Sequence, residues 1–246
     1  MRARRTMAAL SARIRRGAWA WPIAMVAMAC LAGAAHAQAQ SPEPAPASSA
    51  PSEAERLVFQ HEHLGTNRQP RVLRYAYVAE AAGKPKITDR AVLTLDKDAA
   101  GQCCQVHGDY LSGAMTVNLP DIPDARANPV LLYFLEGEVR LLERTTAGQA
   151  AHFRRRIRQA LADTATVSDT TVQWGGRSVP AKTVRVVPYV DDPYRARFEA
   201  QAATEYSFVL ADAVPGGVYA VSATVPAKDS SAGPLARRSL TIEEAK

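Results

Sequence analysis

Apolar residues that alternate with polar ones constrain the fold of this chain most strongly. In residues 72–80, Leu73, Tyr75 and Tyr77 fall on one face of an extended segment. A period of two residues is typical of a half-buried β-strand. Three such segments follow one another with short links, which favours an antiparallel meander. The expected strands are residues 72–80, 91–96 and 115–119.

Two helices are expected next. Asn128-Pro129 is a helix start, because Asn caps well and Pro is harmless in the first turn. Residues 130–144 are either a helix or a buried strand followed by a turn; their length favours a helix, although Gly137 counts against it. Residues 149–163 are the clearest helix, since their apolar residues recur at helical spacing. The two would form a helical hairpin.

The remainder predicts two β-hairpins with a short helix between them. Gly175-Gly176 and the residues 214–217 (Val-Pro-Gly-Gly) can each form a tight turn between apolar strands. Asp191-Asp192-Pro193 would start the short helix, with Tyr194, Phe198 and Ala202 directed inward. The expected order is βββ-αα-ββ-α-ββ, which indicates an α+β fold with an antiparallel sheet rather than a parallel nucleotide-binding fold.

The N-terminus resembles a cleavable export signal. A basic segment without acids is followed by an apolar run over residues 18–35 and by the small-x-small pattern Ala35-His36-Ala37, with Ala39 as a second cleavage position. The alternatives are a transmembrane anchor, a twin-arginine signal at Arg4-Arg5 and lipidation of Cys30. The run is at the lower limit for a membrane span and contains Pro22. We therefore expect a periplasmic protein with no stable membrane anchor after cleavage.

Removal of this segment changes the charge balance. The whole chain has 30 basic and 24 acidic residues, and residues 1–37 hold six arginines and no acid. The mature chain is then formally neutral, which gives no electrostatic reason to expect binding to nucleic acid.

The domain organisation follows from composition. Residues 1–37 are the expected signal peptide, and residues 38–55, rich in Pro, Ala and Ser, are an expected disordered linker. Residues 56–226 are long enough for a single globular domain with its own core. Residues 227–246 are expected to be a polar C-terminal tail, in which Leu240 and Ile242 could form one last short strand.

Cys103 and Cys104 are the only cysteines of the expected mature chain. Thiols in an oxidising compartment tend to pair, so we expect a disulfide between these neighbours within a turn. The alternatives are ordinary thiols, intermolecular pairing, and a thiol or metal site with His107. The spacing matches neither a two-pair zinc site nor a thioredoxin-type motif.

The other candidate features have plainer interpretations. His61 and His63 could contribute to a metal site with His107 or the two thiols as further ligands, but we expect a solvated segment there. The arginines of residues 154–158 could bind an acidic partner or phosphate, against the alternative of a solvated helix face. His152 is expected to flank the core rather than to act as a base, and Asp191 and Asp192 to be turn residues.

The sequence contains no nucleophile elbow, Walker loop or dinucleotide fingerprint, and it suggests no catalytic residue and no cofactor. Residues 128–161, together with residues 187–193 and 214–219, resemble uncharacterised exported proteins of Gram-negative bacteria. That resemblance carries over no functional residue. In architecture alone, the expected fold is similar to the lipoprotein-carrier and lipid-binding folds of the periplasm, and fold does not determine function.

The sequence therefore predicts a non-enzymatic periplasmic protein that binds a protein partner or an apolar ligand in the cell envelope. The alternatives are a thiol- or metal-binding protein centred on Cys103, Cys104 and His107, and a hydrolase whose site is assembled from distant residues. An apolar cavity of several hundred cubic ångströms would favour the ligand-binding hypothesis, and convergent histidines and cysteines would favour the metal hypothesis.

Overall fold

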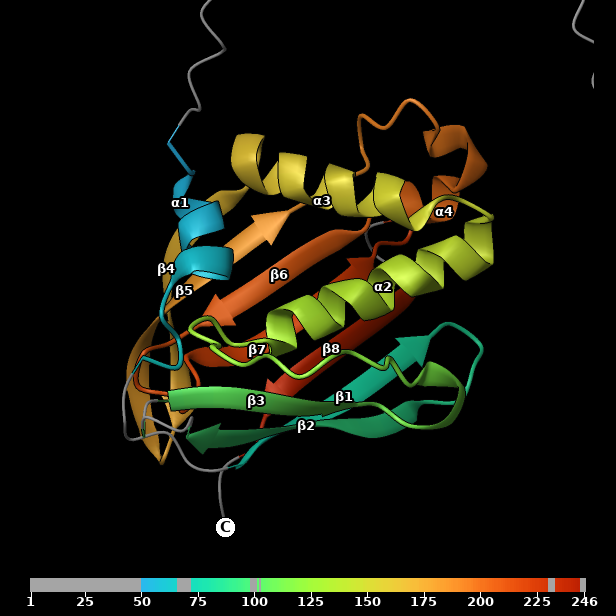
Figure 1. Cartoon of the computed structure of the whole chain (residues 1–246). Helices are drawn as coiled ribbons and strands as arrows, with labels where there is room; N and C mark the ends of the chain where they lie inside the picture. The colour runs from blue at the N-terminus through green and yellow to red at the C-terminus, as the bar shows by residue number, and fades with distance from the viewer. Residues whose placement is uncertain (1–49, 66–71, 98–100, 102, 230–232, 244–246) are drawn as a thin grey trace, which may run out of the picture. The chain divides into compact units, whose positions relative to one another are not determined.

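A computed structural model describes residues 50–65, 72–97, 101, 103–229 and 233–243 (Figure 1). The expected signal peptide and all of the expected linker before residue 50 lie outside these ranges. Within them, no helix has both the length and the apolar character needed to cross a membrane.

The described part of the chain forms one eight-stranded antiparallel sheet, which confirms the α+β class. Its order is β3-β2-β1-β8-β7-β6-β5-β4. The strands are β1 (Val72–Ala81), β2 (Ile87–Lys97), β3 (Cys103–Tyr110), β4 (Thr166–Trp174), β5 (Arg177–Val186), β6 (Glu205–Leu210), β7 (Val218–Val225) and β8 (Ala236–Ile242).

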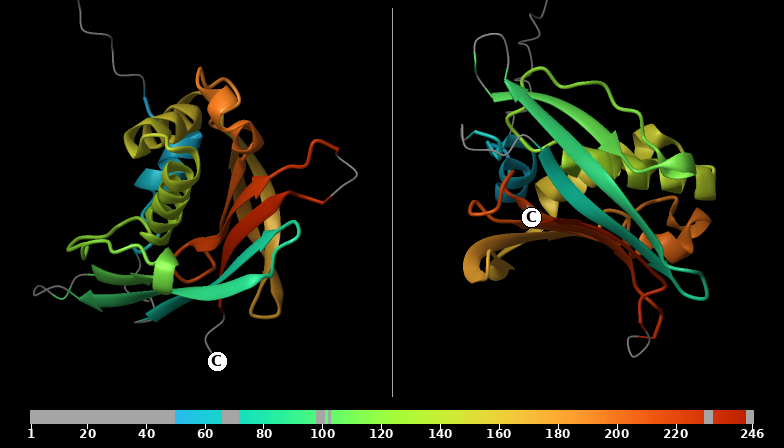
Figure 2. Two further views of the ribbon diagram at one scale, coloured as in Figure 1. Left: turned by 90° about the vertical axis from the view of Figure 1, so that its right-hand side faces the viewer. Right: turned by 90° about the horizontal axis from the view of Figure 1, so that it is seen from below.

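Two long helices cover one face of this sheet. They are α2 (Val130–Thr146) and α3 (Ala150–Asp163), and Figure 2 shows them against the concave side of the strongly bent sheet. The helical alternative for residues 130–144 is the one that the structure adopts. Gly137 lies inside this helix, at a point where α2 packs closely against Tyr110. A Cβ at this position would lie only 3.1 Å from the Tyr110 ring, so the glycine allows the close approach.

The N-terminal described segment also packs against the helices. Ser52 caps the short α1 (Glu53–Glu55), which continues into the π-helical turn η1 (Arg56–Gln60). The Ser52 hydroxyl also donates to the carbonyl of Leu161 over 2.9 Å. Residues 50–55 therefore belong to the folded part of the chain, which corrects the expectation of a disordered linker for this short stretch.

The third strand differs from the one expected. Residues 115–119 are not a strand: Met115 ends a 3-10 turn, η2 (Gly113–Met115), and the chain continues as a loop. The strand is instead β3, in which Cys104, Val106 and Tyr110 are buried and Gln105, His107 and Asp109 are exposed. The vicinal cysteines thus begin an edge strand rather than lie in a turn between strands.

The expected third helix is also broken. Residues 195–202 form a 3-10 turn, η3 (Arg195–Arg197), and the four-residue α4 (Glu199–Ala202). Phe198 is buried as expected, but Tyr194 is 53% exposed because the chain turns at Asp192 instead of continuing as a helix.

The C-terminal strand lies in the centre of the sheet. β8 pairs with β1 on one side and with β7 on the other, and Leu240 is fully buried. The last short strand expected from Leu240 and Ile242 is therefore confirmed, and the expectation of a polar tail over residues 227–246 does not hold for Ala236–Ile242. One hydrophobic cluster joins the sheet to both helices; its largest fully buried side chains include Tyr75, Tyr189, Tyr206, Phe134, Phe153 and Phe208.

Candidate apolar binding groove

An apolar groove of about 560 Å³ opens on the helical side of the molecule. It lies between α2, α3, the turn η1 and the loop that follows β3, elements that can be followed in Figure 1. Its apolar lining residues are Phe59, Leu119, Pro120, Ile122, Leu132, Tyr133, Leu135, Val139 and Ile157. Sites that bind small ligands fall in this size range and are mostly apolar.

Helical periodicity brings the groove residues of each helix onto one face. On α2, Leu132, Leu135 and Val139 are spaced by three and four residues, so they form one stripe. Leu135 and Val139 are buried, whereas Leu132 remains 50% exposed at the groove. A large apolar side chain half in water beside an apolar groove would gain free energy when a ligand covers it.

The charged side chains of the groove wall are partly neutralised. Glu136 accepts hydrogen bonds from Arg154 at 2.9 and 2.7 Å and from Arg140 at 3.0 Å. The bonds from Arg154, followed by those from Arg140, outweigh burial and lower the pKa of the Glu136 carboxyl. Arg158, which also lines the groove, has no hydrogen-bond or ion-pair partner in the described part of the chain.

Tyr133 connects the groove to the sheet. A Cβ at Gly108 of β3 would lie only 2.1 Å from the Tyr133 ring, so the ring occupies the space that a larger residue would need. The Tyr133 hydroxyl is buried and has no hydrogen-bond partner among the described residues. Burial raises the pKa of this phenol, which stays a neutral donor.

A second, smaller cavity of about 210 Å³ lies between α2 and strands β1, β2 and β8. Its wall contains the ion pair of Glu138 and Arg238, with Nη2 to Oε2 at 2.6 Å. Glu138 is 4% exposed, and burial raises the pKa of the neighbouring Tyr77 to about 12. The ion pair connects α2 to β8, so we interpret its role as stabilisation of the fold.

His152 and Asp192 form a pair that the sequence analysis did not anticipate. His152 Nε2 lies 2.7 Å from Asp192 Oδ2, and Asp192 also accepts from the backbone N–H of Tyr194 at 2.8 Å. His152 Nδ1 faces a guanidinium nitrogen of Arg155 at 3.2 Å. Both ring nitrogens are therefore engaged, which leaves neither of them to activate a nucleophile.

Of the histidines proposed as metal ligands, His61 and His63 lie side by side with ring centroids 4.9 Å apart, whereas His107 has a different partner on β3. His61 contacts Asp212 at 3.2 Å on the surface, and His107 contacts Asp121 at 2.7 Å on the outer face of β3. His63 is buried, and its Nδ1 accepts from the backbone N–H of Asn128 at 3.2 Å. Within the described ranges, no group of three His, Cys, Asp or Glu side chains is arranged to hold a metal ion.

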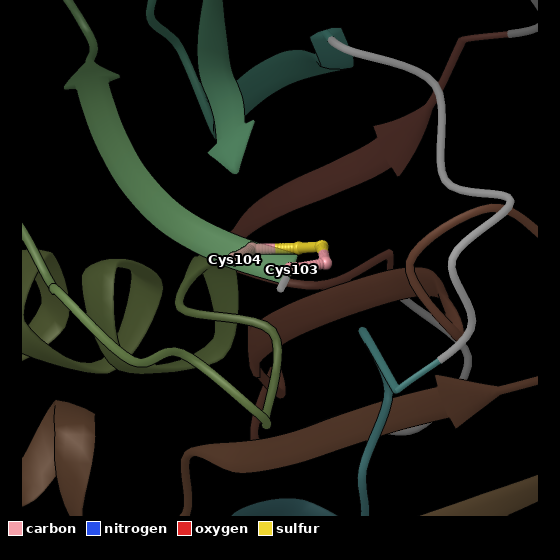
Figure 3. The surroundings of a disulfide bond; sticks show 2 residues. All are labelled: Cys103 and Cys104. Carbon is pink, nitrogen blue, oxygen red and sulfur yellow. A yellow bond between two sulfur atoms is a disulfide. The ribbon is translucent and has the colours of Figure 1, made fainter. Parts of the chain in front are cut away.

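Cys103 and Cys104 are drawn as a disulfide at the start of β3 (Figure 3). Cys104 is 2% exposed, and its carbonyl accepts from the backbone N–H of Ala125 at 2.9 Å. Neither cysteine lines the groove. That this bond forms in the protein isolated from cells stays a prediction.

The comparisons with known proteins add little to this geometry. No protein-family model matches the chain, and no curated protein sequence does. Among solved structures, the lipoprotein LppX of Mycobacterium tuberculosis is similar at 9% sequence identity and a TM-score of 0.34, over 78% of this chain and 95% of the LppX chain. A likeness this distant says nothing about a ligand, so the function rests on the chain's own residues.

Proposed function

We propose that this chain is an exported, non-catalytic binding protein whose groove between α2 and α3 takes an apolar ligand. The observation that carries the proposal is the groove itself: nine of its twelve lining residues are apolar or aromatic, and its volume is about 560 Å³. The N-terminal sequence, with its basic segment, apolar run and Ala37 cleavage position, supports export to the periplasm.

The alternatives have weaker support. The thiol or metal hypothesis requires Cys103, Cys104 and His107 to act together, but His107 faces outward with Asp121 whereas Cys104 is buried on the other face of β3. The hydrolase hypothesis requires an available base, and both ring nitrogens of His152 are engaged. A protein partner remains an outcome of the experiment below.

The experiment is a titration of the purified protein with an environment-sensitive apolar dye. Leu132→Glu places a charge at the mouth of the groove, and because Leu132 is half exposed the variant should fold. Covering a leucine contributes about 1.5–3 kcal/mol when the side chain is wholly exposed at the start. Losing half of that contribution predicts that dye binding weakens by about fourfold to tenfold.

The matched control is Leu235→Glu. Leu235 is 41% exposed and lies outside the groove, so this change should leave dye binding as in the unaltered protein. Equal binding by both variants would place the dye elsewhere and refute the groove. If the unaltered protein binds no apolar probe, the small-ligand function is wrong and a protein partner replaces it.

A further inference from the structure

The arginine cluster of α3 separates into engaged and available side chains. Arg154 is held by Glu136, and Arg156 lies 3.5 Å from Asp192 and 3.2 Å from the amide oxygen of Gln159. Arg155 contacts His152, on the side of α3 that faces away from the groove lining. These three therefore have local structural partners.

Arg158 differs from them in two respects. It is exposed and without a partner in the described chain, and it lines the groove directly after the buried Ile157. Arg154 is paired with Glu136, so Arg158 is the charged residue of the groove lining that has no ion-pair partner in the described chain. An apolar groove with one unpaired positive charge in its wall matches a ligand with an apolar body and a negative end.

The geometry of one guanidinium also selects among anionic groups. A guanidinium can bind a carboxylate through two parallel hydrogen bonds, and such charge-assisted bonds are stronger than neutral ones. A phosphate monoester carries nearly two charges and three acceptor oxygens, which one arginine would satisfy less completely.

We propose that the ligand of the groove is a long-chain carboxylate, that is, a single-chain fatty acid, whose head group binds Arg158. This inference rests on the proposed function, because it identifies the ligand class of the same groove. The chain lies along Leu132, Leu135 and Ile157, and the carboxylate lies at the guanidinium. Arg158 contributes affinity for the head group and none for the chain.

The test compares palmitate with hexadecanol, which has the same number of carbons and no charge, by displacement of the apolar dye below the concentration at which either aggregates. Palmitate should bind about tenfold more tightly, as expected for one charge-assisted pair. In Arg158→Gln this advantage should disappear while the affinity for hexadecanol stays the same. Arg158→Lys, which keeps the charge, should retain part of it.

Arg177→Gln is the matched control, because Arg177 is an exposed arginine at the β4–β5 turn, outside the groove. It should keep the full preference for palmitate. If hexadecanol and palmitate bind equally, and Arg158→Gln changes neither, the carboxylate assignment is refuted while the groove function stands.

Two other outcomes would also overturn the assignment. Hexadecyl phosphate binding more tightly than palmitate, in a manner that needs Arg158, would identify a phosphate-headed ligand instead. Displacement of palmitate by acetate at similar concentrations would show a simple anion site without the groove. If neither long-chain ligand binds, the proposed function itself fails.

Discussion

The buried His63 makes the stability of the fold sensitive to mild acid. Burial is the main cause that lowers its pKa to about 4, and the charge of the neighbouring His61 adds to the effect. A backbone hydrogen bond with Leu57 and the charge of Asp212 act in the opposite direction. The unfolded chain has an ordinary histidine with a pKa of 6.5. Since the unfolded state binds the proton more tightly, stability falls as the pH drops from 6.5 towards 4.

The magnitude follows from the two pKa values. One unit of pKa difference corresponds to about 1.4 kcal/mol, so the His63 contribution lost is about 2 kcal/mol between pH 7 and pH 5 and about 3 kcal/mol by pH 4. This is a large part of the stability of an ordinary domain. Urea unfolding followed by the fluorescence of Trp174 at several pH values would measure it.

His63→Gln isolates this contribution. Glutamine can still accept from the N–H of Asn128 but does not titrate, so the difference between the two proteins should shrink by about 2 kcal/mol from pH 7 to pH 5. The carboxylates of the protein are present in both the wild type and His63→Gln, so their titration cancels in the comparison. His107→Gln is the control: Asp121 raises the pKa of His107, so its contribution is present at low pH and is lost as the pH rises. Parallel stability curves for wild type and His63→Gln over this range would refute the reasoning.

Three further outcomes are expected. Glu138→Ala should destabilise the fold by about 3–5 kcal/mol in thermal or urea unfolding, because it leaves the arginine of a buried ion pair without its partner; a loss under 1 kcal/mol would show that the pair contributes nothing. Replacing Cys103 and Cys104 together by Ser should lower stability by about 1 kcal/mol or less, since the closed loop constrains little of the unfolded chain. Thiol titration of the unreduced, unfolded protein should find no free thiol, and two free thiols would disprove the disulfide. Intact-mass analysis should find the mature N-terminus after Ala37 or Ala39, and retention of the apolar run would indicate an anchor.

Local patterns were sufficient for much of the fold. Helical spacing of apolar residues located α2 and α3, because this signal accumulates over many residues. The glycine pairs marked the two late hairpins, because Gly175 and Gly176, with φ of 56° and 72°, adopt a backbone conformation that other residues avoid.

The strand β3 was not predicted from the sequence, and the reason is physical. Its inward positions are Cys104, Val106, Gly108 and Tyr110, and the glycine interrupts the apolar alternation. The gap is filled by the Tyr133 ring from α2, a contact that no local pattern reveals. A strand that takes part of its apolar face from another element looks polar in sequence.

The groove could not be predicted for a related reason. Its lining comes from four segments that are distant in sequence, around Phe59, Ile122, Leu135 and Ile157. Each segment shows only a few apolar residues, and it is the packing of the helical hairpin that leaves them uncovered on one side. The availability of Arg158 within a run of similar arginines likewise depends on the tertiary partners of its neighbours.

The central position of β8 has a consequence for how the chain reaches this fold. Strands β1–β3 and β4–β7 can each form early by pairing between sequence neighbours, but they become one sheet only when β8 enters between β1 and β7. That step closes contacts between residues near both ends of the domain, and such long-range contacts form slowly. Until it is complete, β1 and β7 are unpaired inner edges, the kind of surface through which chains associate with one another. The last few residues of the domain thus govern whether two partial sheets become one protein or an aggregate.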